Sequence, residues 1–239
     1  MISICVPFYP WHRGYDRSEE VFDVLVKGLN NTTHAKSLEL CLTDGGVTDI
    51  WARRNKGGRT WNSEAFEQRL KKEFKGRLNY SLTKALIHKD SGGARRFWLT
   101  QGVIRSVRRA SYENLLIFGI DCYAPRDLVQ RFNSTVKEGT AWVLLSFNLP
   151  RGAPLAINEA GGNGFNWHTA RGIVGIKKSD YKKVGGYEAS LPLISTRSDS
   201  DFFNRMMAKI NVVIRKEVGL FHVNHPGSNA NRFWKLEDA

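Results

Sequence analysis

Two aspartates stand a few residues after segments that have the composition of buried strands. Asp44 follows residues 38–42, and Asp121 follows residues 115–118. Carboxylate oxygens are the ligands that hard divalent cations prefer, so these residue types predict a site for a nucleotide and a divalent cation. The alternative is that each aspartate only caps the turn or helix that follows it.

A strand, a helix and a second strand are predicted near the start of the chain. Residues 2–6 are short, β-branched and closed by a proline, as in a buried parallel strand. Apolar residues recur at helical spacing over 18–29, and residues 38–42 form the next expected strand. This order predicts an α/β sheet, in which ligands bind beyond the carboxyl ends of the strands. The residues that follow the first strand are Pro7, Phe8 and Tyr9.

The remaining pattern continues the alternation of helices and strands. Further helices are expected at 63–75, at 94–110, from 125–128 onward and at 202–207, and further strands at 115–118, 141–147 and 212–215. In the 94–110 helix, Val103, Ile104 and Val107 are expected to face inward. No internal repeat interrupts this pattern, which predicts one continuous α/β domain.

The composition of the 239 residues is that of a globular protein, with 41% hydrophobic residues. No apolar run reaches the roughly 18–20 residues of a membrane-spanning helix, and the first residues lack the features of a signal peptide. Three cysteines are too few for a disulfide framework, so we expect a reduced, cytoplasmic protein. The net charge of +13 predicts attraction to a polyanion, which is a nucleotide, a nucleic acid or an anionic membrane surface.

Six segments in order resemble the GT-A glycosyltransferases, especially the inverting family 2 type and its galactosyltransferase-like relatives. They are the opening strand 2–9, an Asp-x-Gly-Ser-Thr-Asp-like segment at 44–49, an Asp-x-Asp-like strand at 116–121, a Gly-Gly-Tyr segment at 185–188, a Glu-Asp-x-Asp-like segment at 198–202 and a His-x-x-His at 222–225. The resemblance implies a Rossmann-like, mostly parallel sheet flanked by helices. It also implies a nucleotide-sugar half at 1–127 and an acceptor half at 128–239 within the single domain 1–239.

The same resemblance implies a role for individual residues. Asp199 would be the catalytic base, with Asp201 or a simple helix cap as alternatives for this acidic segment. The divalent ion, Mn²⁺ or Mg²⁺, would be held by Asp121, His222 and His225. The nucleotide-sugar donor, a UDP-sugar, would contact Pro7, Tyr9, Asp44, Arg95 and Arg96.

The sequence departs from the family pattern at three places. Gly119 stands where the first aspartate of Asp-x-Asp is expected, which leaves Asp121 as the metal-binding position. The usual Arg-Asn segment is replaced by residues 98–102, so Arg95 or Arg96 is expected to contact the diphosphate as a forked donor. Ser198 replaces the glutamate that precedes the base.

The acceptor is left open by the fold, because one fold serves many substrates. The basic stretch 53–77, with Arg53 and Arg54, favours DNA that carries a hydroxymethylated base, and Arg105, Arg108 and Arg109 add to this basic surface. Trp167 would then hold the flipped base. The alternative acceptor is a surface polysaccharide or a lipid-linked glycan, with 63–75 as a membrane-docking helix. A third interpretation is a non-catalytic protein that binds nucleotide sugars or nucleic acid.

Overall fold

The computed structural model describes residues 1–12, 15–16, 18–46, 61–83, 87–89, 95–97, 99–149, 165–166, 173–189 and 195–223. Four of the expected site residues lie outside these ranges: Arg53, Arg54, Trp167 and His225. For Arg95, Arg96 and His222, the structure describes the strands that contain them.

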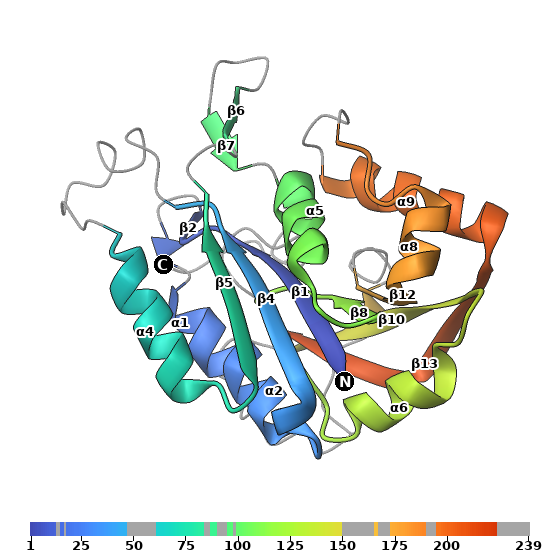
Figure 1. Cartoon of the computed structure of the whole chain (residues 1–239), viewed down its shortest axis with the longest axis horizontal. Helices are drawn as coiled ribbons and strands as arrows, with labels where there is room; N and C mark the ends of the chain where they lie inside the picture. The colour runs from blue at the N-terminus through green and yellow to red at the C-terminus, as the bar shows by residue number, and fades with distance from the viewer. Residues whose placement is uncertain are drawn as a thin grey trace, which may run out of the picture.

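One large sheet forms the centre of the molecule, and its strands follow the order β5-β4-β1-β8-β12-β10-β13-β9, with β11 paired to β10 (Figure 1). The strands are β1 (Ile2–Phe8), β4 (Leu38–Asp44), β5 (Arg77–Leu82), β8 (Asn114–Ile117), β9 (Cys122–Tyr123), β10 (Thr140–Leu149), β11 (Phe165–Asn166), β12 (Val174–Lys177) and β13 (Asn211–Val223). The block β5-β4-β1-β8 is parallel. Strand β12 is antiparallel to β8 and to β10, and β13 runs parallel to β10.

Helices cover both faces of this sheet. They are α1 (Ser18–Glu20), which continues through a π-helical stretch (Val21–Val26) into α2 (Lys27–Asn31), then α4 (Ser63–Glu73), α5 (Leu99–Arg109), α6 (Leu128–Thr135), α8 (Lys178–Val184) and α9 (Ser195–Lys209). The helices α2, α4 and α6 share one apolar core, and α5, α8 and α9 share the other. The mostly parallel α/β architecture predicted from the sequence is therefore confirmed.

Strand β1 shows why both faces are covered. Its apolar side chains alternate between the two cores, with Ile4 and Val6 in the first and Cys5 in the second. All three side chains are buried. A strand that is apolar on both faces needs a layer of helices on each side, which is the usual situation of parallel sheets.

The expected helix at 94–110 is wrong at its start. Residues 95–97 form β7 (Arg95–Phe97), which pairs with β6 (Ile87–Lys89) in a small antiparallel hairpin. Helix α5 begins only at Leu99, and its inward-facing residues Val103 and Val107 are buried as predicted. A second small hairpin joins β2 (Trp11–His12) to β3 (Tyr15–Asp16).

One interpretation of 63–75 is a membrane-docking helix. The large apolar side chains of α4 are not available for that role, because they face the core. Its apolar side chains Phe66 and Leu70, and Phe74 just beyond it, are buried in the core. Phe66 stacks on Phe8 of β1, with ring centroids 5.0 Å apart. The apolar stripe is thus used to hold the helix on the sheet. In the part of the chain that the structure describes, no helix is both long enough and apolar enough to span a bilayer.

Candidate active site

The carboxyl ends of three parallel strands meet at one edge of the sheet, as predicted. Phe8 at the end of β1 lies beside Asp44 at the end of β4, and the Gly45 N–H donates to the Phe8 carbonyl over 2.8 Å. On the other side of β1, the Phe118 N–H that follows β8 donates to the Cys5 carbonyl over 3.1 Å. The segment that contains Asp121 therefore begins next to β1, at the point where the strand order reverses.

The carboxylate of Asp44 is fully buried and is held by three donors. The indole N–H of Trp61 donates to Oδ2 over 2.9 Å, and the hydroxyl of Tyr80 donates to the same oxygen. The backbone N–H of Gly46 donates to Oδ1 over 2.7 Å. Burial raises the pKa of Asp44, and these hydrogen bonds act in the opposite direction.

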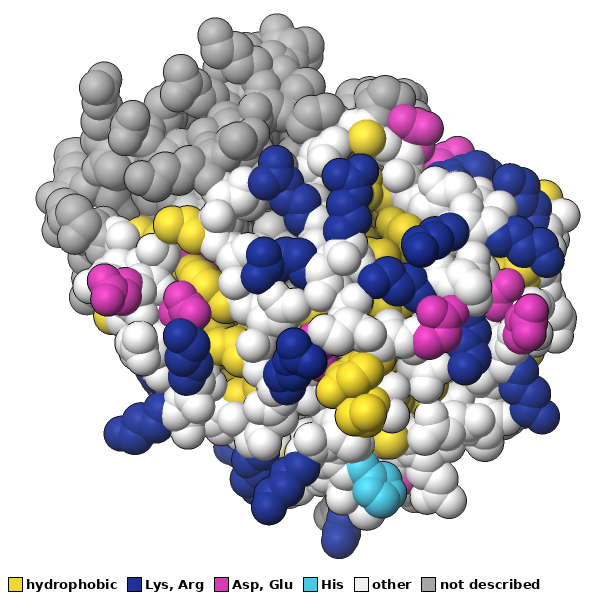
Figure 2. All heavy atoms as spheres, in the orientation of Figure 1, with side chains coloured by type: hydrophobic (Ala, Val, Ile, Leu, Met, Phe, Trp, Pro, Cys, Tyr) yellow, Lys and Arg dark blue, Asp and Glu magenta, His cyan; other side chains and the backbone are white. Residues whose placement is uncertain are grey.

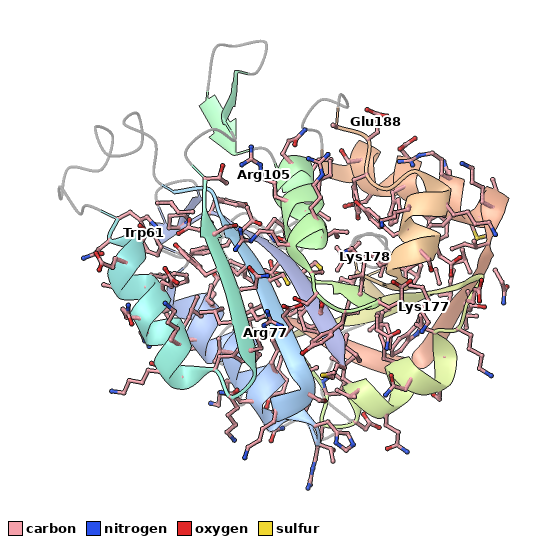
Figure 3. All side chains as sticks on the ribbon, in the orientation of Figure 1. Trp61, Arg77, Arg105, Lys177, Lys178 and Glu188 are labelled. Carbon is pink, nitrogen blue, oxygen red and sulfur yellow. The ribbon has the colours of Figure 1, made fainter. Side chains whose placement is uncertain are left out.

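Asp44 thus ties the end of β4 to the start of α4 and to β5. Trp61, which Figure 3 labels near the start of α4, also packs on Phe66, with ring centroids 4.9 Å apart. Contact between Asp44 and a nucleotide base stays a prediction. Sequence reasoning did not place Trp61 or Tyr80 at this edge; a tryptophan just before a helix start gave a weak signal, and Tyr80 gave none.

Asp121 lies in a turn that follows β8, where Gly119 replaces an expected aspartate. A Cβ atom on Gly119 would lie 2.5 Å from Asp121 Oδ1, so glycine leaves the space that this carboxylate occupies. The thiol of Cys122 lies 3.6 Å from the same oxygen. Glycine at position 119 is therefore compatible with the observed position of Asp121, whereas any side chain there would require the Asp121 carboxylate to move.

His222 is brought close to this turn by strand pairing. It lies in β13, directly opposite Cys122 of β9, the residue after Asp121. The expected histidine is therefore part of a strand and does not follow one at 212–215. Within the described ranges, no group of three or more His, Cys, Asp or Glu side chains is arranged to hold a metal ion. A metal site at Asp121 with His222 and His225 stays a prediction.

Asp199 lies inside a helix and does not cap one. Helix α9 begins at Ser195, so Asp199 is in its second turn and the capping interpretation is wrong. The neighbouring candidate, Asp201, forms an ion pair with Arg205 one turn later, with an N···O distance of 2.6 Å. The internal pairing of Asp201 leaves Asp199 as the better candidate for a proton acceptor.

A buried tyrosine positions Asp199. The Tyr187 hydroxyl donates to Asp199 Oδ1 over 3.1 Å, and its ring stacks on Phe202 with centroids 4.5 Å apart. Burial raises the pKa of Asp199 to about 6, and the hydrogen bond from Tyr187 opposes that rise. This pKa is closer to neutral pH than that of an ordinary aspartate, as a group that accepts and releases protons near neutral pH requires.

The glycines before Tyr187 determine where its ring goes. Gly185 and Gly186 have φ values of +97° and +61°, which side chains disfavour. A Cβ atom on Gly186 would lie 2.7 Å from the Tyr181 ring. The Tyr181 hydroxyl in turn accepts the Tyr187 N–H over 3.1 Å. The Gly-Gly-Tyr segment therefore places the Tyr187 hydroxyl against the Asp199 carboxylate.

Helices α5 and α9 meet close to Asp199. The buried Thr100 hydroxyl donates to Ser198 Oγ over 3.1 Å. Further along α5, Ser106 donates to the Val6 carbonyl near the carboxyl end of β1. Since a helix rises about 1.5 Å per residue, Thr100 lies roughly 9 Å further toward the site edge. Asp199 is thus placed at this edge, and the β6-β7 hairpin with Arg95 and Arg96 directly precedes the same helix end (Figure 1).

Comparisons with known proteins give matches among solved structures. No protein-family model and no curated protein matches the chain. S. aureus TarS 1-349 in complex with UDP-GlcNAc is similar over 98% of this chain and 61% of that chain, with a TM-score of 0.61 and 12% identity. Mannosyltransferase PcManGT from Pyrobaculum calidifontis in complex with GDP-Man and Mn²⁺ is similar over 97% and 59%, with a TM-score of 0.57 and 13% identity.

The structural similarity establishes the fold. Because the sequence identities are only 12% and 13%, the activity has to be argued from the site. The chain spans about 60% of the length of these two solved chains. The match nevertheless extends over 97% and 98% of the present sequence. The chain therefore has the GT-A glycosyltransferase fold.

Proposed function

We propose that this chain is a glycosyltransferase that moves a sugar from a nucleotide-sugar donor to an acceptor hydroxyl with inversion at the sugar carbon. The observation that carries the proposal is the environment of Asp199. Its carboxylate is partly buried at the site edge and accepts one hydrogen bond within the described residues, from Tyr187. One oxygen of the carboxylate is thus left for a substrate proton.

The proposed role of Asp199 is that of a general base. The acceptor oxygen attacks the sugar carbon while Asp199 takes the proton of the acceptor hydroxyl, and the nucleoside diphosphate leaves with the electrons of the broken bond. With a pKa of about 6, Asp199 is mostly ionised at neutral pH and can accept this proton. Tyr187 holds the carboxylate in place through its hydroxyl.

The donor is proposed to lie along the ends of β1 and β4. Pro7, Tyr9 and Asp44 would face the nucleotide, and Arg95 or Arg96 would bind the diphosphate. Asp121, His222 and His225 would hold Mn²⁺ or Mg²⁺, which offsets the charge of the leaving diphosphate when bound. The solved structures support a nucleotide-sugar donor and a divalent ion in general, because one contains UDP-GlcNAc and the other contains GDP-Man and Mn²⁺.

For the acceptor we propose a hydroxymethylated base in DNA, and the net charge of +13 supports a polyanionic acceptor. Arg53, Arg54 and Trp167 would contact it. The second candidate is a surface polysaccharide or lipid-linked glycan. The similarity to an S. aureus TarS structure and to a mannosyltransferase favours sugar transfer in general and does not select between these acceptors.

The test is nucleotide release from UDP-GlcNAc and GDP-mannose with Mn²⁺, in the presence and absence of hydroxymethylated DNA. Asp199→Asn should lower turnover on the order of 10²- to 10⁴-fold, since this is the usual contribution of a general base. Asp201→Asn is the matched control, because it makes the same change two residues away on an ion-paired group. Equal rates in wild type and Asp199→Asn would exclude Asp199 as the base.

A thermal-shift measurement distinguishes an enzyme from a binding protein. Binding of a nucleotide sugar to the folded state raises the melting temperature in either case. A shift without turnover in any donor and acceptor combination would favour the non-catalytic interpretation. No shift with any nucleotide sugar would argue against the donor site itself.

A further inference from the structure

Two cations of α4, Arg69 and Lys71, are neutralised by neighbouring carboxylates. On α4, Arg69 forms ion pairs with Glu19 at 2.8 Å and with Glu73 at 2.7 Å. Lys71 pairs with Glu67 on the same helix at 2.8 Å. On this side, therefore, the positive charge that the sequence concentrates in 53–77 is partly cancelled within the region that the structure describes.

The cations on α5 are held in a different way. The Arg105 guanidinium donates to the Thr83 hydroxyl over 2.8 Å. The Arg109 guanidinium donates to the Asn79 side-chain oxygen over 2.6 Å and to the Tyr80 carbonyl over 3.1 Å. These acceptors are neutral, so they fix the side chains without cancelling their charge.

Two further cations, Arg108 and Lys178, lie on or next to α5. Arg108 is exposed, and among the described residues it makes no hydrogen bond and no ion pair. Lys178 of α8 donates to the carbonyl of Ala110, just after α5, over 2.6 Å. Figure 2 shows Lys and Arg side chains gathered over this face, and Figure 3 labels Arg105 and Lys178 on it. We name the surface formed by Arg105, Arg108, Arg109 and Lys178 the α5 basic face.

The carboxylates near this face do not cancel it. Glu39 is fully buried and accepts hydrogen bonds from Ser3 and Ser111, while the exposed Arg77 lies 3.6 Å from it. Glu113 accepts the Ser179 N–H over 2.7 Å, and the charges that act on it are those of Lys177 and Lys182. Neither acid pairs with a member of the α5 basic face.

We propose that the α5 basic face binds the phosphate backbone of a nucleic acid. Guanidinium groups that are already ordered by neutral anchors lose little side-chain entropy when they meet phosphates, and the N–H groups that these anchors do not use can donate to phosphate oxygens. Helix α5 begins beside Ser198 and extends for about 16 Å, so a polyanion along it reaches the edge that contains Asp199. The proposal rests on the proposed function only in naming this polyanion as the acceptor.

A membrane surface fits this face less well. Membrane-docking surfaces combine basic residues with apolar side chains that enter the lipid. Among the described residues, the large exposed hydrophobic side chains are Met1, Leu82, Met207 and Ile214. None of the four belongs to α5 or α8. Leu82 adjoins the face, because it precedes Thr83, the anchor of Arg105. With four cations beside it, this apolar side chain is a minor part of the surface, which favours phosphates over lipid.

The experiment is fluorescence anisotropy with a labelled duplex of about 20 base pairs, over about 50 to 200 mM salt. The test protein carries Arg105→Gln, Arg108→Gln and Arg109→Gln. The matched control carries Lys71→Gln, Lys72→Gln and Lys75→Gln, which removes the same charge from the α4 side. Loss of three phosphate contacts should lower the slope of log K against log salt by about 2 to 3, whereas the control should leave the slope within about 1 of wild type.

Arg108→Glu alone is the variant that cannot act through lost internal bonds, since Arg108 makes none in the described part of the chain. It should weaken duplex binding at least about tenfold at 100 mM salt, with an unchanged melting temperature. Equal slope changes in the test and control proteins would overturn the proposal, as would absence of duplex binding in the wild type. Binding of anionic phosphatidylserine vesicles without binding of DNA would also overturn it in favour of a membrane. Because no sugar transfer is measured, these outcomes do not depend on the donor site.

Discussion

Asp44 and Asp199 lie at the same edge of the sheet, and burial raises the pKa of both carboxyl groups. They differ in the number of internal donors. Asp44 accepts hydrogen bonds from three groups, on Gly46, Trp61 and Tyr80, whereas Asp199 accepts one from Tyr187 within the described residues. Burial raises both pKa values and so does not by itself separate the proposed base from a carboxylate that only holds the fold together. The number of internal donors decides whether an oxygen remains for a substrate.

The largest expected effect is on stability when the Asp44 cluster is broken. Asp44→Ala removes the acceptor of three donors and should lower the free energy of unfolding by about 3 to 4 kcal/mol, measured by urea denaturation. Asp199→Ala removes the acceptor of one donor and should cost about 1 kcal/mol. If both substitutions cost the same, the proposed distinction between a structural and a chemical carboxylate is wrong.

The second effect is a pH dependence that Asp199 contributes. Its pKa rises from 3.8 to about 6 on folding, so the folded state binds this proton more tightly than the unfolded chain. The contribution to stability is fully present below pH 3.8 and is lost as the pH rises through about 6. Asp199→Asn does not titrate. Its stability relative to wild type should therefore rise by about 1 to 3 kcal/mol over this window, after allowance for solvent screening.

Urea denaturation at a series of pH values measures this difference. Asp44 titrates in both proteins, so its own raised pKa cancels from the comparison. A stability difference that is flat between pH 4 and pH 7 would mean that Asp199 keeps its ordinary pKa.

The third effect concerns the backbone that presents Tyr187 to Asp199. Gly186→Ala places a side chain at φ +61° and at 2.7 Å from the Tyr181 ring. We expect a loss of about 2 kcal/mol or more in urea denaturation. Gly139→Ala is a matched control, since Gly139 has φ +72° and an added Cβ there meets nothing within 4 Å. Equal losses in the two variants would show that the Tyr181 contact contributes nothing.

The smallest effect isolates the single hydrogen bond to Asp199. Tyr187→Phe removes the donor that stabilises the ionised carboxylate, so the pKa of Asp199 should rise above its value of about 6. A rise of about one unit is expected and is measured by carboxyl-carbon NMR titration or by the acidic limb of kcat/KM. Tyr181→Phe removes a hydroxyl that bonds the Tyr187 N–H and should shift this pKa less. An unchanged titration in Tyr187→Phe would rule out Tyr187 as a positioning residue.

The sequence by itself determined the class of fold and the approximate positions of the first strands, although β1 and β4 extend beyond the predicted ends, to Phe8 and Asp44. Apolar runs such as 2–6 and 38–42 can only be buried on both faces, and the helical spacing in 18–29 supplies one of the covering layers. The order of these elements was therefore enough to place the residues just after each strand at one edge of the sheet. The strand at 95–97 could not be predicted, because its formation depends on pairing with 87–89.

Only the tertiary structure decided what the candidate residues contact. Asp44 meets Trp61 and Tyr80, which lie 17 and 36 positions away in the chain, and Asp199 meets Tyr187 across the junction of α8 and α9. The same holds for charge, since the composition counts Arg69 and Arg105 alike. Folding places Arg69 beside carboxylates and Arg105 beside a hydroxyl. Composition counts charges, but their cancellation depends on distances between side chains, and those distances exist only in the folded chain.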